Sequence, residues 1–80
     1  MNEEIFAAVK RIAAVLFDMP ESEVTLETSP VTVETWDSVQ QLNLTLELEQ
    51  VFGVTLEPEE MEQVRSIGDA VYLIEKKRRP

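Results

Sequence analysis

The amino-acid sequence predicts an all-α protein, a small three-to-four-helix bundle with a long loop between the first and second helices. Apolar residues recur at helical spacing in three long segments, and residues that cap helices stand at the segment boundaries. The triplets that look like β-strands are shorter than a typical strand of about 5–6 residues. The chain has 80 residues, so we expect residues 1–80 to form a single domain around one small core.

The first helix is expected to begin after Asn2, which is a suitable N-cap, and to end before Pro20. Glu3 and Glu4 suit its first turn, because acidic side chains interact favourably with the positive end of the helix dipole. Its apolar residues fall on one side at spacings of three and four: Ile5, Phe6, Val9, Ile12, Ala13 and Leu16. This pattern is typical of an amphipathic helix that buries one face in a bundle.

Between residues 18 and 37 the helical periodicity is lost. A loop of this length in a small domain is unusual, and such loops are generally functional or partly helical. Residues 20–23 are expected to form one helical turn, and Trp36 to anchor the loop where it meets the next helix rather than to act as a stacking platform. Four apolar side chains are expected to hold the loop on the core: Val24, Leu26, Val31 and Val33. A small sheet is the alternative interpretation of this segment.

The next helix is expected from Ser38 to Phe52, and it has apolar residues on two sides. The side expected to face the core carries Leu44, Leu48, Val51 and Phe52. The roughly opposite side carries Val39, Leu42 and Leu46. A helix with two apolar sides is either buried all round or meets a second partner. Gly53 is the residue expected to end this helix.

Two further helices are expected in the last third of the chain. Pro58 suits the first position of a short helix of under three turns. Ser66 and Asp69 match a capping box, which predicts a last helix. The residues expected in the core of that helix are Ile67, Ala70, Val71 and Ile74. The basic residues expected at its negative dipole end are Lys76, Lys77, Arg78 and Arg79.

The composition excludes several classes of function. The chain has no cysteine and no histidine, so it cannot form a Ser-His-Asp or Cys-His catalytic device or a zinc site built on those residues. Its net charge of −9 disfavours nucleic acid and anionic membrane surfaces and favours partners with basic patches. No stretch is apolar enough to span a bilayer and no targeting signal is evident, so we expect a cytoplasmic protein. The missing histidine disfavours a hydrolase, and we expect a protein that is not an enzyme.

An acidic cluster surrounds the predicted short helix, at Glu57, Glu59, Glu60 and Glu62. Such a cluster raises the question of calcium binding, but it lacks the order of acidic residues that a tight calcium loop requires. We therefore interpret it as a solvated helix face and predict no metal site.

Ser38 follows Asp37 at the start of the most apolar helix. From position alone, the preferred interpretation is that Asp37 or Ser38 is an N-cap, since such residues open many helices. The start of a helix also favours an anion, because its backbone N–H groups are unpaired and its dipole end is positive. A phosphate ester on Ser38 would therefore be stabilised there.

The stretch Trp36-Asp37-Ser38-Val39 resembles the Asp-Ser-Leu motif of the acyl carrier protein family. The resemblance covers nearly the whole chain, since the opening helix, the long loop, the Asp-Ser pair and the later stretch FGVTLEPEEME occur in the family's order. It implies that Ser38, beside Asp37, bears 4′-phosphopantetheine as a phosphodiester attached by a phosphopantetheinyl transferase. The thiol of that arm would carry an acyl group as a thioester, so that a chain without cysteine takes part in thiol chemistry.

The resemblance also implies a docking surface for partner proteins. Val39, Leu42 and Leu46 match the apolar part of that surface, and Glu47 and Glu49 remain as the acidic residues of the helix. Burial of the three apolar residues against the loop is the alternative interpretation. The implied partners are the transferase and the acyl-loading and acyl-using enzymes, which would meet a monomeric carrier through basic patches.

The sequence departs from the fatty-acid carrier pattern at several positions. Val39 stands where leucine is usual, and Trp36 replaces a small residue. Gln40, Gln41 and Asn43 occupy a segment that is usually acidic. These departures favour a specialised stand-alone carrier in fatty-acid-like, polyketide or other secondary biosynthesis. The alternatives are an aminoacyl or peptidyl carrier domain, or an acidic helical adaptor protein without a cofactor.

Overall fold

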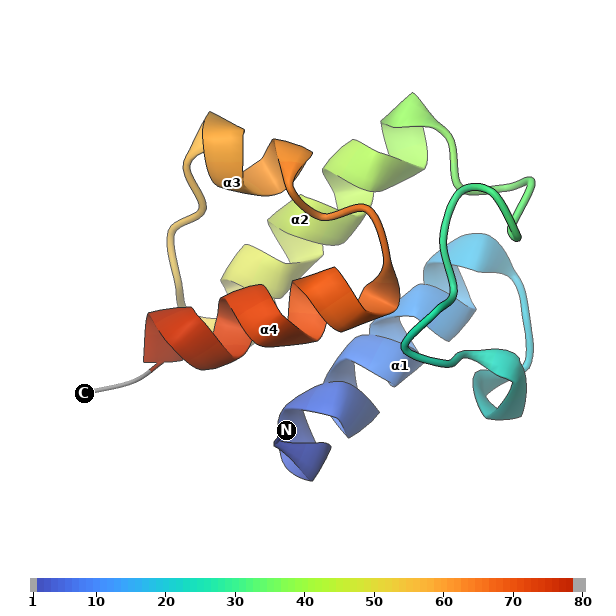
Figure 1. Ribbon diagram of the computed structural model, residues 1–80, viewed down its shortest axis with the longest axis horizontal. Helices are drawn as coiled ribbons and strands as arrows, with labels where there is room; N and C mark the ends of the chain where they lie inside the picture. Colours follow the sequence, from blue (N-terminus) through green and yellow to red (C-terminus); the bar gives the residue numbers. More distant parts are fainter. Residues whose placement is uncertain (1, 79–80) are drawn as a thin grey trace.

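The computed structural model describes residues 2–78 of the chain. These residues form four α-helices and one 3₁₀-helix: α1 (Glu3–Phe17), η1 (Glu21–Glu23), α2 (Ser38–Phe52), α3 (Pro58–Glu62) and α4 (Ile67–Arg78). The described part of the chain contains no β-strand, and the four α-helices surround one core, with the long loop between α1 and α2 at one end (Figure 1). The predicted all-α bundle is therefore confirmed, and the alternative of a small sheet is wrong.

Helix α1 is the element against which the rest of the bundle packs, since it contacts α2, α4 and η1. Asn2 caps it as predicted, with its side chain accepting hydrogen bonds from the N–H groups of Glu4 and Ile5. The buried residues recur at a spacing of four: Ile5, Val9, Ala13 and Phe17. Ile12 and Leu16 are only half-buried, so the buried stripe is rotated slightly from the one that the sequence predicts. The rotation brings Phe17 under the long loop.

The long loop is held by backbone hydrogen bonds as well as by some of its apolar side chains. Val24 is buried and Val33 is half-buried, as predicted, but Leu26 and Val31 are exposed, which contradicts the prediction for those two residues. The carbonyl groups of Leu26 and Thr28 instead accept hydrogen bonds from the first N–H groups of α4. These bonds satisfy donors that a helix start leaves unpaired, so the loop and α4 stabilise each other without burying Leu26.

Gly68 makes this backbone contact possible. Its N–H donates to the Leu26 carbonyl at 2.8 Å, and a Cβ atom at this position would lie only 3.0 Å from the same oxygen. Any larger residue would therefore press against the loop. The predicted helical turn at residues 20–23 is confirmed as η1, which follows Pro20.

Helix α2 presents a different core face from the one that the sequence predicts. Leu44 and Leu48 are fully buried and Phe52 is half-buried, but Val51 is 49% exposed. Thr45 takes the buried place instead, with its hydroxyl donating to the carbonyl groups of Gln41 and Leu42. The buried face of α2 is therefore rotated toward Thr45 compared with the predicted face, and Val51 lies at its edge.

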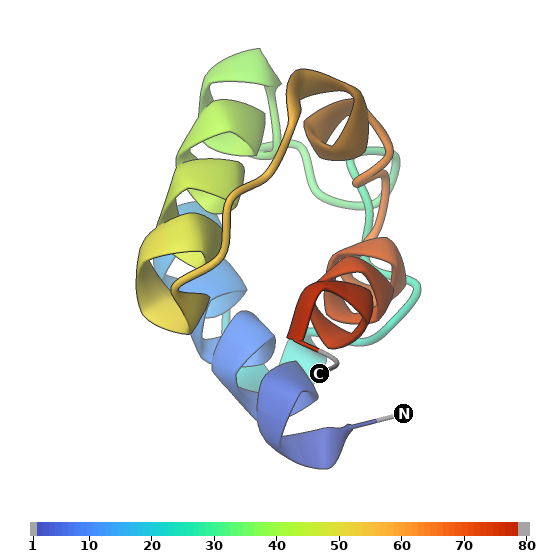
Figure 2. The same ribbon diagram turned by 90° about the vertical axis from the view of Figure 1, so that its left-hand side faces the viewer.

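Helices α3 and α4 close the other side of the core, where Figure 2 shows them opposite α2. α4 buries the four predicted residues and also Leu73. Ser66 and Asp69 cap its start, since the Ser66 hydroxyl accepts from the Asp69 N–H and the Asp69 carboxylate accepts from the Arg65 N–H. The basic residues Lys76, Lys77 and Arg78 lie in the last turn, while Arg79 lies outside the described residues. Across residues 2–78, every helix is too short or too polar to cross a membrane.

An ion pair connects α3 with the end of α4. Lys77 Nζ lies 2.7 Å from Glu60 Oε1, and the same oxygen accepts a hydrogen bond from the Glu57 N–H. The hydrogen bond from Lys77, followed by that from Glu57, lowers the pKa of the Glu60 carboxyl below its ordinary value. Both bonds favour the ionised carboxylate in the folded protein.

Glu60→Gln is therefore expected to lower the melting temperature slightly at neutral pH and to have no effect in acid. Because the folded-state pKa lies below the unfolded one, the ionised group stabilises the fold above its ordinary pKa, and this stabilisation disappears as the pH falls through the folded-state value. Glutamine retains the carbonyl that accepts from Glu57. Thermal melts across pH test this, with exposed Glu59→Gln as the control, and an equal loss at acid pH would contradict it.

Candidate functional site

The start of α2 is organised by Asp37, and this leaves Ser38 free of a capping role. The Asp37 carboxylate accepts a hydrogen bond from the Gln40 N–H at 2.9 Å, so Asp37 is the N-cap and Ser38 is the first helical residue. Ser38 is exposed, and its hydroxyl makes no hydrogen bond with any residue from 2 to 78. A reactive oxygen is thus presented to solvent at the positive end of a four-turn helix, where an attached anion is favoured.

Trp36 fixes the chain immediately before this helix. Its indole ring is buried and stacks on the Phe17 ring, with the centroids 4.7 Å apart. The Thr35 hydroxyl adds a hydrogen bond of 3.0 Å to the Phe17 carbonyl. The predicted anchoring role of Trp36 is therefore confirmed, and its burial leaves no exposed face for a stacking platform.

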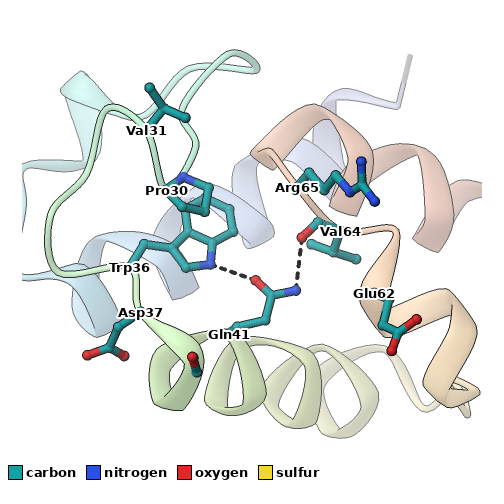
Figure 3. Close-up of a pocket in the computed structure, with 9 residues that line it drawn as sticks. Pro30, Val31, Trp36, Asp37, Gln41, Glu62, Val64 and Arg65 are labelled. Atoms are coloured by element: carbon teal, nitrogen blue, oxygen red, sulfur yellow. Dashed lines mark hydrogen bonds between the residues drawn. The ribbon is translucent and has the colours of Figure 1, made fainter.

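Gln41 connects this anchor to the segment that follows α3. Its Oε1 accepts from Trp36 Nε1 at 2.6 Å, while its Nε2 donates to the carbonyl groups of Met61 at 3.0 Å and Val64 at 2.9 Å. We call this set of three hydrogen bonds the Gln41 bridge, and Figure 3 shows it running from Trp36 to Val64. Since both hydrogens of the amide are used, a glutamate at this position could not make the same contacts.

The Gln41 bridge is a feature that the sequence interpretation missed. Gln40, Gln41 and Asn43 stand out in the sequence only as neutral residues in place of acids. In the structure Gln40 Nε2 donates to the Leu16 carbonyl, and Asn43 Nδ2 donates to Gln40 Oε1 at 2.8 Å. One signal was available, because Gln41 precedes Leu44 and Leu48 at helical spacing, and a polar residue on a core face needs partners.

An open pocket of about 590 Å³ lies beside Ser38. The long loop contributes Pro30, Val31 and Trp36 to its walls, and the segment after α3 contributes Val64 and Arg65 (Figure 3). The Gln41 side chain lines the pocket between these two segments. An apolar wall, charged residues at the margin and a nearby hydroxyl are thus brought together from three separate parts of the chain.

The predicted docking residues lie on the outer face of α2. Val39, Leu42 and Leu46 are 66%, 52% and 44% exposed, so their burial against the loop is ruled out. Glu47 is exposed on the same helix. Glu49 differs, because it is half-buried and its carboxylate accepts a hydrogen bond of 2.8 Å from the Leu56 N–H. Glu49 therefore has a structural role in holding the segment between α2 and α3.

Comparison with known proteins shows which family has this architecture. A family model described as a phosphopantetheine attachment site matches residues 7–74. The acyl carrier protein of Petrotoga mobilis is 37% identical over 76 residues, which cover 95% of this chain and 89% of that protein. The chain belongs to the acyl carrier protein family.

Other members of the acyl carrier protein family agree in sequence and in fold. The acyl carrier protein of Thermotoga maritima is 36% identical over 95% of this chain and 94% of its own length. The solution structure of the holo acyl carrier protein from Geobacter metallireducens has a TM-score of 0.80 and 29% identity, over 91% of this chain and 84% of that one.

Membership of the acyl carrier protein family settles several expectations. The chain is a carrier rather than an enzyme, and its prosthetic group is 4′-phosphopantetheine. The alternative of an adaptor without a cofactor is therefore wrong. Acyl carrier proteins in general interact with phosphopantetheinyl transferases and with acyl-handling enzymes. Within residues 2–78, no three acidic side chains gather as metal ligands, and the acids around α3 lie on its surface or in its cap.

Proposed function

We propose that Ser38 is the residue that bears the phosphopantetheine arm. The observation that carries this proposal is the exposed hydroxyl of Ser38 at the first position of α2, with the capping role taken by Asp37. A transferase needs access to the oxygen it modifies, and the Ser38 hydroxyl has no competing hydrogen bond within residues 2–78. Modification would therefore cost the fold no contact.

Several residues hold the start of α2 in a geometry that suits attachment of the arm at Ser38. Asp37 starts the helix, so that the positive dipole end is directed at the phosphodiester that Ser38 would carry. Trp36 and Thr35 fasten the preceding backbone to Phe17, which holds Ser38 on a rigid base. The bound arm supplies the thiol that forms the thioester, a group that this chain lacks.

The outer face of α2 is proposed as the docking surface. Val39, Leu42 and Leu46 form an exposed apolar stripe that starts next to Ser38, and Glu47 adds an exposed negative charge. Apolar residues that remain exposed on a small protein often mark a contact site. Glu49 contributes to this surface through its charge while its carboxylate also holds Leu56.

The pathway is proposed from the departures at the start of α2. Gln40, Gln41 and Asn43 remove charges that a general fatty-acid carrier would use, so a specialised stand-alone carrier in polyketide, fatty-acid-like or other secondary biosynthesis is favoured. An aminoacyl or peptidyl cargo is the alternative. The carrier would act in the cytoplasm as a monomer, with enzymes that present basic patches.

Intact mass spectrometry tests the proposed function. The chain is incubated with coenzyme A and a broad-specificity phosphopantetheinyl transferase, and the addition of one phosphopantetheine is expected. A chain that stays unmodified with several such transferases would contradict the proposal. Loading of the modified chain with aminoacyl or acyl groups by candidate enzymes then separates the two classes of cargo.

Salt is expected to slow the association of this carrier with its transferase. The net charge of −9 attracts a basic partner, and this attraction is screened over about 8 Å at physiological ionic strength. Stopped-flow association rates should fall by roughly tenfold or more from low to high salt. Glu47→Gln should weaken this dependence, whereas rates that are equal at both salt concentrations would show that charge does not guide docking.

A further inference from the structure

An apolar cargo attached near Ser38 can be buried away from water in two places. One is the open pocket beside Ser38, and the other is the helical core beneath it, between α2 and the segment that follows α3. Burial becomes more favourable as the cargo lengthens, because each methylene group removed from water adds to the driving force. The place that a cargo occupies therefore depends on whether the core can be entered.

The Gln41 bridge lies between these two places. Gln41 extends from α2 between the indole of Trp36 and the backbone of Val64, and Figure 3 shows the bridge spanning the space between the two segments. Leu44 and Leu48 follow Gln41 on the same face of α2, and both are fully buried in the core. In the described part of the chain no buried side-chain polar atom lacks a hydrogen-bond partner.

Entry of a long chain into the core would disturb three hydrogen bonds at once. The indole N–H of Trp36 and the carbonyl groups of Met61 and Val64 all bond to the one amide of Gln41, although the Met61 carbonyl also accepts from the Val64 N–H at 3.2 Å. A buried polar group left without its partner is costly, more so than the gain from forming the bond. The buried side chains of Leu44 and Leu48 would also have to move, because protein cores are closely packed.

We propose that the Gln41 bridge bars long alkyl chains from the core and that Gln41, with Trp36, determines cargo specificity. This inference rests on the proposed attachment of the arm at Ser38. A short acyl or aminoacyl group remains outside, against Pro30, Val31 and the margin formed by Arg65. A long alkyl chain that is kept out of the core lies against this open pocket, so it gains no protection from water or from small nucleophiles.

Thioester cleavage by hydroxylamine tests the proposal. The transferase is given butyryl- or dodecanoyl-coenzyme A, and intact mass confirms that one acylated arm has been added before any rate is measured. In the wild type both thioesters should be cleaved at similar rates. In Gln41→Leu the dodecanoyl thioester should be cleaved about tenfold more slowly than the butyryl thioester, because burial of even two methylene groups favours the enclosed state by about that factor.

Two further variants complete the experiment, one as a control and one as a second change in the bridge. Gln50→Leu adds the same leucine at an exposed position of α2 and should behave as the wild type. Trp36→Phe removes the indole donor of the bridge together with part of the ring that stacks on Phe17, and it serves if Gln41→Leu does not fold. Slower cleavage of the dodecanoyl thioester in the wild type would overturn the proposal, as would equal rates in a folded bridge variant. If the chain gains no mass, the proposed attachment of the arm at Ser38 is refuted. This outcome is distinct from a failure of the proposal on the Gln41 bridge.

Discussion

Ser38→Ala is expected to abolish attachment of the phosphopantetheine arm completely. No other residue is proposed to accept the phosphodiester, and alanine has no oxygen to form it. Intact mass after incubation with coenzyme A and a transferase should show no addition to Ser38→Ala and one addition to the wild type. Ser22→Ala is the matched control, because Ser22 is also an exposed serine but lies in η1, away from the start of α2.

The same variant should leave the fold intact. Asp37, not Ser38, caps α2, and the Ser38 hydroxyl makes no hydrogen bond within residues 2–78. The melting temperature of unmodified Ser38→Ala should therefore equal that of the unmodified wild type. Addition of an arm to Ser38→Ala would show that another residue is the attachment site, and a large fall in melting temperature would show that the hydroxyl supports the helix.

Leu48→Ala is expected to cause a large loss of stability. Leu48 is fully buried between the helices, and a leucine-to-alanine change in a core costs about 2–5 kcal/mol of unfolding free energy. This is a large share of the roughly 5–15 kcal/mol that stabilises a typical domain. The melting temperature should fall by about 10 °C or more, as measured by circular dichroism or calorimetry.

Leu46→Ala is the comparison that separates the two apolar faces of α2. Leu46 is 44% exposed, so its truncation should cost less than about 1 kcal/mol and barely change the melting temperature. It should nevertheless slow modification by the transferase, because Leu46 belongs to the proposed docking surface. Leu42→Ala should behave in the same way. If Leu46→Ala were modified at the wild-type rate, the docking surface would have to lie elsewhere.

Local chemistry in the sequence determined the helices, while the candidate attachment residue came from the resemblance of the stretch around Ser38 to a known family. Asn2 and Asp37 mark helix starts through side chains that accept backbone N–H groups, and Gly53 marks a helix end because it adopts a left-handed conformation, with φ of 63°. These signals act within one turn of the chain, so they can be interpreted without knowing what packs nearby. The position of Ser38 at the start of α2 follows from the same local rules.

Only the tertiary structure decided which residues of each segment face the core. Val51 and Val31 are as apolar as the residues that are buried, yet both are exposed, while Thr45 is buried. The choice depends on the direction from which another segment approaches, and a helix or loop alone contains no information on that direction. Hydropathy therefore identified the apolar sides of α2 but not the limits of the buried one.

The Gln41 bridge depends on tertiary structure to a still greater degree. Its partners are 5 residues before Gln41 and 20 and 23 residues after it. In the sequence Gln41 is distinguished only by the charge it lacks, whereas in the folded chain its amide bonds to a buried indole and to two backbone carbonyls. A hydrogen bond between distant segments exists only once the rest of the fold has placed its donor and acceptor within about 3 Å of each other, and no local pattern encodes that distance.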